Sequence, residues 1–362
     1  MLKSPRSSLE LVCRRFSEEL SLFAALEASS HPSPPANGGT RYQFYPSDTD
    51  AVADAFALCE HMKVKHRLYR TGFRGAKVVA RQTGPISDKT LLRAALVELL
   101  TEFDGRLFTG CDLNTDLEDM QHVQRSAPFV LAALGSDIDP GRATGEGVVA
   151  SLVGALRELE PRGFATPERF LVLGCGATGS VVARRLRDAG ARVLTYDIRS
   201  ERADIPGCEN VSAVPDWASL PHDVLLPCSA SRLIDHHVAR RLTCRLIVGA
   251  SNDPITEAAE RILDGREILW VPDPVSNAGA VVVDSIEHYA SATLRTTDPA
   301  DVYRFVGELL GGQTQRLVKS SLEDRRSMRL LVEAQTEVRD IGPPCGMSFP
   351  AWLDRHRTRE AA

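Results

Sequence analysis

The sequence predicts an α/β protein of two domains, the second of which is a Rossmann-type doubly wound parallel sheet. The chain has 362 residues, a length that suits two domains. Residues 170–197 have the pattern of a buried strand, a glycine turn, a helix and a second strand. Short apolar runs typical of buried strands follow at 223–228, 245–250 and 267–271, with helical patterns between some of them. This alternation is typical of a parallel sheet covered by helices.

The N-terminal third predicts a smaller α/β unit. The apolar run at 19–28 fits either a helix or a strand, and proline and glycine at 29–39 indicate a loop. Residues 48–62 have helical apolar spacing behind an N-cap-like start, and 88–103 form a second amphipathic pattern. Between them, the run at 77–80 predicts a short buried strand.

These patterns divide the chain into three parts. We expect an N-terminal α/β domain over 1–138, a Rossmann domain over 139–292 and a C-terminal helical segment over 293–362. The helices of the last segment are expected to pack back across both domains. Residues 341–352 (IGPPCGMSFPAW) give no basis for an assignment.

Composition narrows the function classes. Net charge is −5 and the pI near 6.0, which disfavours nucleic acid and anionic membranes as partners. No apolar run approaches the roughly 20 residues of a membrane helix. The N-terminus lacks an apolar signal core, so a cytoplasmic location is expected. The eight cysteines form no C-x-x-C pair, which favours free thiols and predicts no metal site.

The strongest local motif is G-x-G-x-x-G at Gly174, Gly176 and Gly179, directly after the strand FLVL. In a dinucleotide-binding fold these glycines provide a tight turn, close approach to the pyrophosphate, and close helix–strand packing. The pyrophosphate is then bound at the helix N-terminus. The competing interpretation is a glycine turn in a sheet that binds nothing, which the surrounding strand and helix disfavour.

Asp197 indicates which dinucleotide is bound. It ends the next strand, 18 residues after Gly179, where an acid accepts hydrogen bonds from a ribose 2′-hydroxyl and repels a 2′-phosphate. NAD is therefore the expected cofactor. Arg199 and Arg202 lie close in sequence and are able to accommodate a phosphate, which leaves NADP open.

Further motifs occur in a fixed order along the chain. They are ANGGTR at 36–41, MKVKH, RGAK, TGCDLNTDLEDM, TGEGV at 144–148, GCGATG, LPCSA at 226–230, GASND at 249–253 and PDPVSNAG at 272–279. Lys65 and Lys77 are 12 residues apart, and Asp112 follows 35 residues after Lys77. In these motifs and spacings, over roughly residues 20–330, the chain resembles the Glu/Leu/Phe/Val dehydrogenase family, closest to its leucine and phenylalanine branch.

The resemblance implies NAD-dependent oxidative deamination of an L-amino acid to its 2-oxo acid and ammonia, or the reverse reaction. The resemblance implies that Lys65 binds the substrate α-carboxylate and that Lys77 activates the attacking water. It also implies that Asp112 carries a proton to and from the substrate nitrogen. The residue types suit these roles, because a shielded lysine near other cations has a lowered pKa and acts as a base. The hydride passes to the nicotinamide.

The resemblance also implies binding positions elsewhere in the chain. Those expected around the cofactor are Gly174, Gly176, Ala177, Thr178, Gly179, Asp197, Ile198, Thr144, Cys228, Ser229, Asn252 and Asn277, and those around the substrate include Gly39 and again Asn252. The active site is expected between the domains, at the carboxyl ends of the Rossmann strands, and closure is expected to exclude water. Members of the family are usually oligomers, so a homo-oligomer is expected.

The positions expected to bind the substrate side chain are Asn37, Gly110, Val281 and Asp284. Leucine-type enzymes have apolar residues there, and burying an unpaired carboxylate is costly. We therefore expect a substrate whose side chain offers a hydrogen-bond donor or a cation, with Gly110 making room for it. The alternative is that Asp284 turns away and pairs elsewhere.

The segment before the catalytic lysine contains fewer glycines than is usual for the family and reads Arg74-Gly75-Ala76-Lys77. This difference affects the backbone beside Lys77. An inward-pointing Arg74 would lower the pKa of Lys77.

Three other functions compete with this interpretation. One is a reductive aminase dedicated to an unusual amino acid in specialised biosynthesis. Another is a catalytically inactive NAD-binding sensor or scaffold, which the joint presence of Lys65, Lys77 and Asp112 disfavours. A 2-hydroxy acid dehydrogenase is the weakest, because His236 and His237 have no clear acidic partner in the sequence.

Overall fold

The computed structural model describes residues 2–3, 9–28, 34–84, 88–337 and 343–360. The chain divides into two compact units. Unit 1 comprises Met1–Asp137, Asp284–Thr296 and Arg339–Ala362, and unit 2 comprises Ile138–Val283 and Thr297–Val338. Because unit 1 takes up two C-terminal stretches, it is not continuous in sequence. The domain limits expected from the sequence, 1–138, 139–292 and 293–362, stay a prediction.

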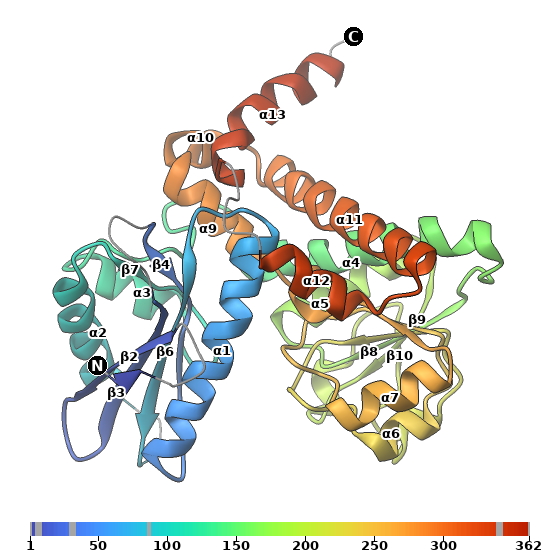
Figure 1. Cartoon of the computed structure of the whole chain (residues 1–362), viewed down its shortest axis with the longest axis horizontal. Coiled ribbons are helices and arrows are strands. Elements are labelled where there is room, and N and C mark those ends of the chain that lie inside the picture. Colours follow the sequence, from blue (N-terminus) through green and yellow to red (C-terminus); the bar gives the residue numbers. More distant parts are fainter. Residues whose placement is uncertain (1, 4–8, 29–33, 85–87, 338–342, 361–362) are drawn as a thin grey trace. The chain divides into compact units, whose positions relative to one another are not determined.

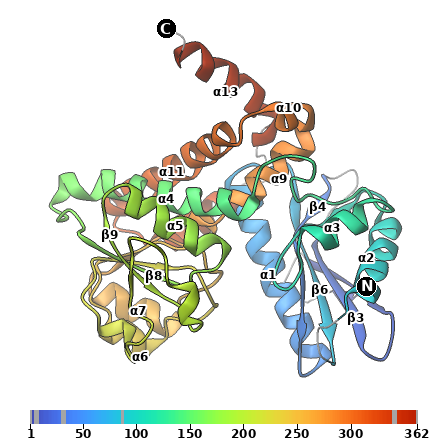
Figure 2. The same cartoon turned by 180° about the vertical axis from the view of Figure 1, so that it is seen from behind.

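Unit 1 is a mixed sheet with helices on both faces (Figures 1 and 2). Its strands are β1 (Leu2–Lys3), β2 (Leu9–Arg15), β3 (Leu20–Glu27), β4 (Ala36–Asn37), β5 (Thr40–Phe44), β6 (Arg74–Gln82) and β7 (Leu107–Phe108). Its helices are α1 (Asp48–Leu68), α2 (Thr90–Phe103), α3 (Leu117–Gln124), α10 (Ser291–Thr296), α13 (Cys345–Glu360) and the end of α9 (Gly279–Tyr289).

The sheet of unit 1 is organised around β6, in the order β1-β2-β3-β6-β4-β7 with β5 also paired to β6. Strands β2 and β3 form an antiparallel pair, and β3 runs antiparallel to β6. By contrast, β4 and β5 lie parallel to β6. The apolar run that fitted either a helix or a strand is therefore the strand β3.

Alternation along β3 explains how the two layers form. Leu22 and Ala24 pack with the apolar face of α2, whereas Phe23 and Ala25 pack with α1. Figures 1 and 2 show α1 along one face of the sheet and α2 with α3 along the other. Since both faces are covered, β6 is buried over most of its length, which places its side chains in the core of unit 1.

Unit 2 contains a parallel sheet. Its strands are β8 (Arg169–Leu173), β9 (Arg192–Tyr196), β10 (Glu209–Asn210), β11 (Val224–Pro227), β12 (Leu246–Ile247) and β13 (Leu269–Trp270). Its helices are α4 (Pro140–Leu159), α5 (Ala177–Asp188), α6 (His236–Arg241), α7 (Glu257–Gly265), α8 (Asp273–Ser276), the start of α9, α11 (Pro299–Asp324) and α12 (Met328–Thr336), with short 3-10 turns at Glu160–Arg162, Ser200–Arg202 and Trp217–Ser219.

The strand order of unit 2 is β10-β9-β8-β11-β12-β13, with every pair parallel. The order reverses between β8 and β11, which is the doubly wound arrangement with its switch point at the end of β8. Helices α4 and α5 lie on one face of the sheet, and α6 and α7 on the other (Figures 1 and 2). The predicted α/β class with a Rossmann-type sheet is confirmed.

The C-terminal helices divide between the units. Helix α11 packs along α4, and α12 follows it, all in unit 2. The segment that the sequence left unassigned begins α13 at Cys345, whose backbone N–H donates to the carbonyl oxygen of Arg70 in unit 1 (2.7 Å). Long-range backbone bonding thus holds a segment with little local signal of its own.

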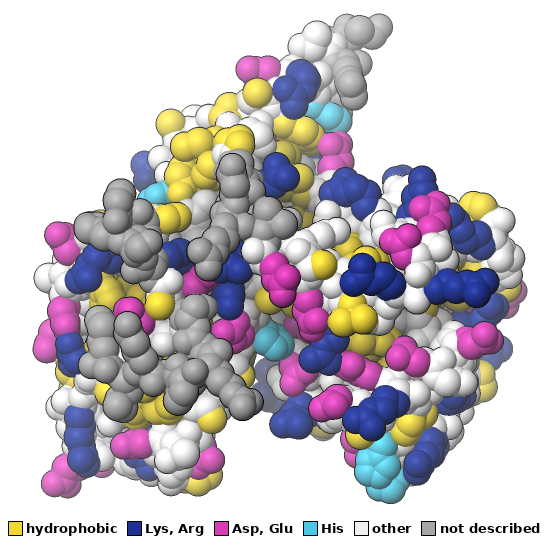
Figure 3. All heavy atoms as spheres, viewed as in Figure 1, with side chains coloured by type: hydrophobic (Ala, Val, Ile, Leu, Met, Phe, Trp, Pro, Cys, Tyr) yellow, Lys and Arg dark blue, Asp and Glu magenta, His cyan; other side chains and the backbone are white. Residues whose placement is uncertain are grey.

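The surface carries charges of both signs. On the face in Figure 3, Lys and Arg side chains alternate with Asp and Glu over each unit, among the described residues. Such mixing agrees with the small net charge of −5. Among the described residues, no helix has the length and apolar character needed to cross a bilayer.

Candidate active site

The centre of the candidate site is Lys77, in the middle of β6. Because β6 is covered on both faces, the Lys77 residue is only 5% exposed. Its Nζ lies 3.0 Å from Oδ2 of Asp112, and the two form an ion pair in which the lysine is buried and the aspartate is partly exposed. Burial lowers the pKa of Lys77, and although Asp112 opposes this, the nearby Arg41 adds to the lowering. A lysine that gives up its proton more readily is suited to act as a base.

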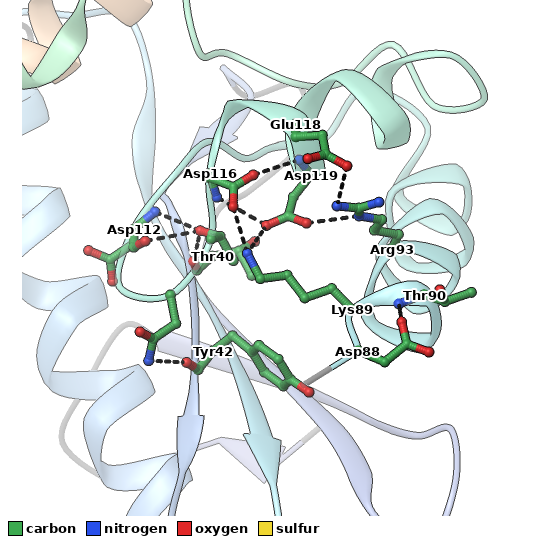
Figure 4. Close-up of polar contacts among 12 residues, drawn as sticks. Thr40, Tyr42, Asp88, Lys89, Thr90, Arg93, Asp112, Asp116, Glu118 and Asp119 are labelled. Carbon is green, nitrogen blue, oxygen red and sulfur yellow. Dashed lines mark hydrogen bonds and ion pairs between the residues drawn. The ribbon is translucent and has the colours of Figure 1, made fainter. Parts of the chain in front are cut away.

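Asp112 is held in a tightly bonded loop after β7. The hydroxyl of Thr115 accepts a hydrogen bond from the Asp112 backbone N–H (2.9 Å) and donates to the carbonyl oxygen of Thr40 (2.8 Å). Asn114 has a left-handed backbone (φ 61°) and donates from its side chain to the carbonyl oxygen of Tyr42 (2.9 Å). These contacts tie the loop to β5 (Figure 4). They fix the backbone position from which the Asp112 side chain extends.

A cluster of charges anchors the end of the same loop (Figure 4). Asp116 caps α3 through a capping box with Asp119, which is fully buried. Lys89 lies 2.8 Å from Asp116 and 2.6 Å from Asp119, and Arg93 lies 2.8 Å from the other oxygen of Asp119. The cluster therefore connects the start of α2 to the loop of Asp112.

The electrostatics keep Asp112 ionised. Burial raises the pKa of Asp112, but Lys77 and Arg41 outweigh it, so the net pKa lies well below the usual range. The structure thus joins two of the predicted residues, Lys77 and Asp112, in one contact.

Lys65 occupies the last turn of α1 and is also buried, at 7% exposed. The close packing of α1 on β6 depends on Gly75, because a Cβ there would lie 2.6 Å from the backbone nitrogen of Lys63. The neighbouring His66 is fully buried, and burial lowers its pKa to about 4. Its Nε2 donates to the carbonyl oxygen of Asn37 (3.0 Å). The end of α1 therefore supports both Lys65 and the strand β4.

Asn37 and Asp284 bond to each other. The Asn37 amide donates to Oδ2 of Asp284 at 2.7 Å, across 247 residues of sequence, within unit 1. Burial raises the pKa of Asp284 well above its usual value, although the bond from Asn37 opposes this. The partner of the Asp284 carboxyl is thus another of the positions predicted to bind the substrate side chain, and the two predicted positions lie together.

Two sequence interpretations require correction. A Cβ at Gly110 would lie 2.2 Å from the carbonyl oxygen of Leu131, so close backbone approach explains this glycine and it opens no room for a substrate. Arg74 does not face Lys77: its guanidinium donates to the carbonyl oxygens of Pro34 and Glu27. The guanidinium beside the Lys77–Asp112 pair belongs to Arg41, which the sequence displays only as the last residue of ANGGTR.

Gly39 lies against the same loop. A Cβ on it would meet the carbonyl oxygen of Cys111 at 2.8 Å and the Asp112 side chain at 3.1 Å. Any larger residue would push against the loop, so Gly39 lets β5 and Asp112 approach each other.

In unit 2 the three motif glycines have distinct environments. Gly174 has φ +90°, and its backbone N–H donates to the carbonyl oxygen of Tyr196 (2.7 Å). A Cβ at Gly179 would lie 1.9 Å from the Gly174 carbonyl oxygen, whereas a Cβ at Gly176 would meet none of the described residues within 4 Å. Gly176 is the N-cap of α5, and Ala177 and Thr178 follow in the first helical turn, so the predicted pyrophosphate position corresponds to a helix N-terminus.

Asp197 directly follows β9 and is buried. Its Oδ2 accepts the backbone N–H of Cys175 (2.8 Å), and its Oδ1 accepts that of Arg199 (2.9 Å). Each carboxylate oxygen has a further lone pair with which to accept a ribose hydroxyl. Ile198, next in sequence, is 91% exposed.

The remaining predicted positions of unit 2 gather near the ends of β11 and β12 and the start of α9. The Asn277 amide donates to Oδ1 of Asn252 (3.0 Å), while its own Oδ1 is buried without a partner among the described residues. Such an acceptor suits an amide N–H donor of a cofactor. Thr144 accepts the backbone N–H of Ala280 (3.2 Å), and Ser229 N–H donates to Ser251 (2.8 Å).

Two predicted positions carry less information. Burial raises the pKa of the Cys228 thiol to about 12, so it is not a nucleophile. Val281 is buried in unit 2, at 5% exposed. Among the described residues, no group of three or more His, Cys, Asp or Glu side chains is arranged to hold a metal ion.

Comparison with known proteins identifies the family. Residues 196–337 match the family model described as Glutamate/Leucine/Phenylalanine/Valine dehydrogenase. Phenylalanine dehydrogenase of Lysinibacillus sphaericus is 25% identical over 83% of this chain and 82% of its own length. Leucine dehydrogenase of Thermoactinomyces intermedius is 29% identical over 68% and 70%. The matched segment and these relatives support the Glu/Leu/Phe/Val dehydrogenase family for this chain. The leucine and phenylalanine branch predicted from the ordered motifs is confirmed, and with it an oxidoreductase of the amino acid dehydrogenase class.

Solved structures support the fold of this family member. L-tryptophan dehydrogenase from Nostoc punctiforme superposes with a TM-score of 0.69 over 91% of this chain and 94% of its own, at 20% identity. The hetero-hexameric glutamate dehydrogenase from Thermus thermophilus gives 0.73 over 91% and 88%, at 18% identity. At these identities the likeness concerns the two-domain Rossmann-type fold alone.

Proposed function

We propose that this family member catalyses the NAD-dependent oxidative deamination of an L-amino acid, and its reverse, in the cytoplasm as a homo-oligomer. The observation that carries the proposal is the buried Lys77, whose Nζ lies 3.0 Å from Asp112. A water-shielded lysine and an ionised carboxylate are the groups that proton transfer at an amino-bearing carbon requires. Named relatives are phenylalanine, leucine and valine dehydrogenases.

The proposed division of labour follows from the charge of each group. The Lys65 ammonium binds the α-carboxylate of the substrate. Lys77, with its lowered pKa, removes the proton from the water that attacks the substrate α-carbon after oxidation. Asp112 accepts and returns a proton at the substrate nitrogen. The nicotinamide, when bound, supplies the hydride acceptor.

The residues of unit 2 suit the dinucleotide. Gly176 and the N-terminus of α5 would hold the pyrophosphate, and Asp197 would accept the ribose hydroxyls. The carboxylate of Asp197 repels a 2′-phosphate, so NAD is preferred in this proposal. Arg199 and Arg202 are the residues that would reverse the preference.

The bonded pair Asn37–Asp284 supports a substrate side chain that offers a hydrogen-bond donor. The Asn37 amide bonds to Oδ2 of Asp284, and the second carboxyl oxygen of Asp284 would accept a hydrogen bond from such a substrate. The proposed substrates are therefore amino acids with polar side chains, neutral or cationic.

The experiment that tests this function follows NADH absorbance with purified protein, NAD or NADP, and a panel of L-amino acids. The panel contains Leu, Phe, Val, Trp, Glu, Gln, Lys, Arg and ornithine, and the reverse reaction uses ammonia with 2-oxo acids. We expect turnover with NAD at least about tenfold more efficient than with NADP. Tight NADH binding without turnover in either direction would instead indicate a cofactor-binding sensor.

The pocket assignment has its own test. Replacing Asn37 by leucine and Asp284 by valine together removes the polar pair and is expected to move preference toward leucine or phenylalanine by about tenfold or more in relative kcat/KM. Both substitutions are made together because either alone leaves an unpaired polar group. The matched control is Glu60→Gln, on the exposed side of α1. An unchanged substrate profile in the double variant would show that these residues do not contact the side chain.

A further inference from the structure

Arg41 lies against the candidate catalytic pair but belongs to none of the roles assigned above. It extends from β5, and its Nε donates to Oδ2 of Asp112 at 2.9 Å. Oδ2 is also the oxygen that faces Nζ of Lys77 at 3.0 Å. The Arg41 side chain is only 15% exposed. Two cations therefore share one carboxylate oxygen, and among the described residues Oδ1 of Asp112 has no side-chain partner.

The Nη1 group of Arg41 is also bonded, in addition to its Nε. Its Nη1 lies 3.1 Å from Oδ2 of Asp54 on α1. The hydroxyl of Tyr45, at the end of the β5 segment, donates to the same oxygen of Asp54. A guanidinium is planar and rigid, so bonds at both edges fix its orientation. The row Lys77–Asp112–Arg41–Asp54–Tyr45 thus joins the catalytic pair to α1.

We propose that Arg41 is a positioning residue: it holds Oδ2 of Asp112 so that Oδ1 addresses the substrate nitrogen, and its charge sets the pH at which Lys77 acts as a base. The inference rests on the proposed function, because the protons concerned are those of amino acid deamination. Arg41 touches neither substrate nor cofactor in this arrangement and acts through Asp112.

The charges around Lys77 predict the direction in which its pKa shifts in each variant. Burial lowers the pKa of Lys77, Asp112 raises it, Arg41 lowers it and Asp54 raises it. Within the described part of the chain, the charged groups that act on the pair are Arg41 from β5 and Asp54 from α1. The titratable hydroxyl of Tyr45, directly after β5, bonds to Asp54. Removing the cation of Arg41 favours the protonated lysine, so the pKa of Lys77 rises. Removing the anion of Asp54 has the opposite effect, so the pKa of Lys77 falls.

The test compares Arg41→Gln, Arg41→Lys and Asp54→Asn with the unaltered enzyme. The control is Arg14→Gln, which removes an arginine from an exposed ion pair with Glu102 in the same unit. Steady-state kcat and KM are measured from pH 6 to 11 with the best substrate of the panel. In parallel, acetylation of Lys77 by acetic anhydride is followed as a function of pH by mass spectrometry. Its pH midpoint, called the Lys77 midpoint, reports the deprotonation of Lys77 without any turnover.

For Arg41→Gln we expect kcat to fall about 10- to 100-fold with KM changed less than about threefold. The Lys77 midpoint should rise by about half a pH unit or more. Arg41→Lys keeps the charge and should restore the Lys77 midpoint. It should restore only part of kcat, because an ammonium group lacks the two donor edges with which the guanidinium bonds Asp112 and Asp54. Asp54→Asn should move the midpoint down, and Arg14→Gln should change neither quantity. If Arg41→Lys unfolds, the opposite shifts expected for Arg41→Gln and Asp54→Asn still decide. If one of the other two unfolds, the shift of its remaining counterpart is compared with the unshifted midpoint of Arg41→Lys.

Three outcomes would overturn the inference. One is a Lys77 midpoint that stays fixed in Arg41→Gln, and another is the same direction of shift in Asp54→Asn. The third is an Arg41→Lys variant whose midpoint matches that of Arg41→Gln. Failure of the proposed function looks different: the unaltered protein would turn over no amino acid, while the acetylation midpoints would still report on Arg41.

Discussion

Replacing Lys77 by alanine is expected to lower kcat for amino acid oxidation by on the order of 10³-fold or more. The reason is the absence of a substitute base: Lys77 is 5% exposed, and its direct ionic partner is the ionised Asp112. Alanine leaves a buried space where water lacks a group to take its proton. The measurement is NADH formation under saturating cofactor and substrate, with single-turnover kinetics to separate chemistry from product release.

The Lys77 experiment needs a lysine control and a binding control. Lys319 on α11 serves as the first, because its side chain is 56% exposed and pairs with the exposed Glu323, and Lys319→Ala should retain nearly full kcat. NADH binding, followed by its fluorescence, should remain within about twofold in Lys77→Ala, since the cofactor residues belong to unit 2. Retention of more than a tenth of kcat would exclude Lys77 as the base.

Replacing Gly38 by alanine is expected to lower the free energy of unfolding by about 3 kcal/mol or more. A Cβ at Gly38 would lie 1.7 Å from the carbonyl oxygen of Ala76 and 2.4 Å from its carbonyl carbon. Both are backbone atoms of β6, next to Lys77, so the strand itself would have to shift. Activity should fall together with stability because the displaced backbone carries the catalytic lysine. Urea unfolding, followed by circular dichroism, measures the change.

Gly84→Ala is the matched control for Gly38→Ala. It lies in unit 1 just beyond β6, and a Cβ there would meet no atom of the described part of the chain within 4 Å. Its expected change in unfolding free energy is about 1 kcal/mol or less, with a stabilising contribution from reduced unfolded-state entropy. Equal stability of Gly38→Ala and Gly84→Ala would mean that β4 and β6 tolerate a wider spacing than the structure shows.

Short-range patterns in the sequence predicted much of the fold. The strand, glycine turn and helix around Gly174 form as predicted, because strand burial, positive φ and helix initiation are each decided within a few residues. The same holds for α2 and for the helices after residue 298. Short strands such as β12 proved briefer than their apolar runs, because pairing with neighbours decides where a strand ends.

Patterns without a periodic signal were less informative. Residues 19–28 fitted a helix or a strand equally well, and only pairing with β2 and β6 decided for a strand. The start of α13 combines proline, glycine and cysteine, and it is held by Arg70 from far away in sequence. Local propensity is a weak guide where long-range bonds supply the stabilisation.

The sequence by itself predicted the family resemblance, the Rossmann-type sheet and the candidate residues Lys65, Lys77 and Asp112, because the order and spacing of motifs can be read along the chain. Only the tertiary structure decided that Arg41 and not Arg74 faces Lys77, that Asn37 pairs with Asp284, and that Gly110 serves backbone packing. The physical reason is how far apart in sequence the interacting residues lie. Turns and strands are specified by neighbours in the chain, whereas ion pairs and close approaches depend on strand register and helix packing, which join residues far apart in sequence.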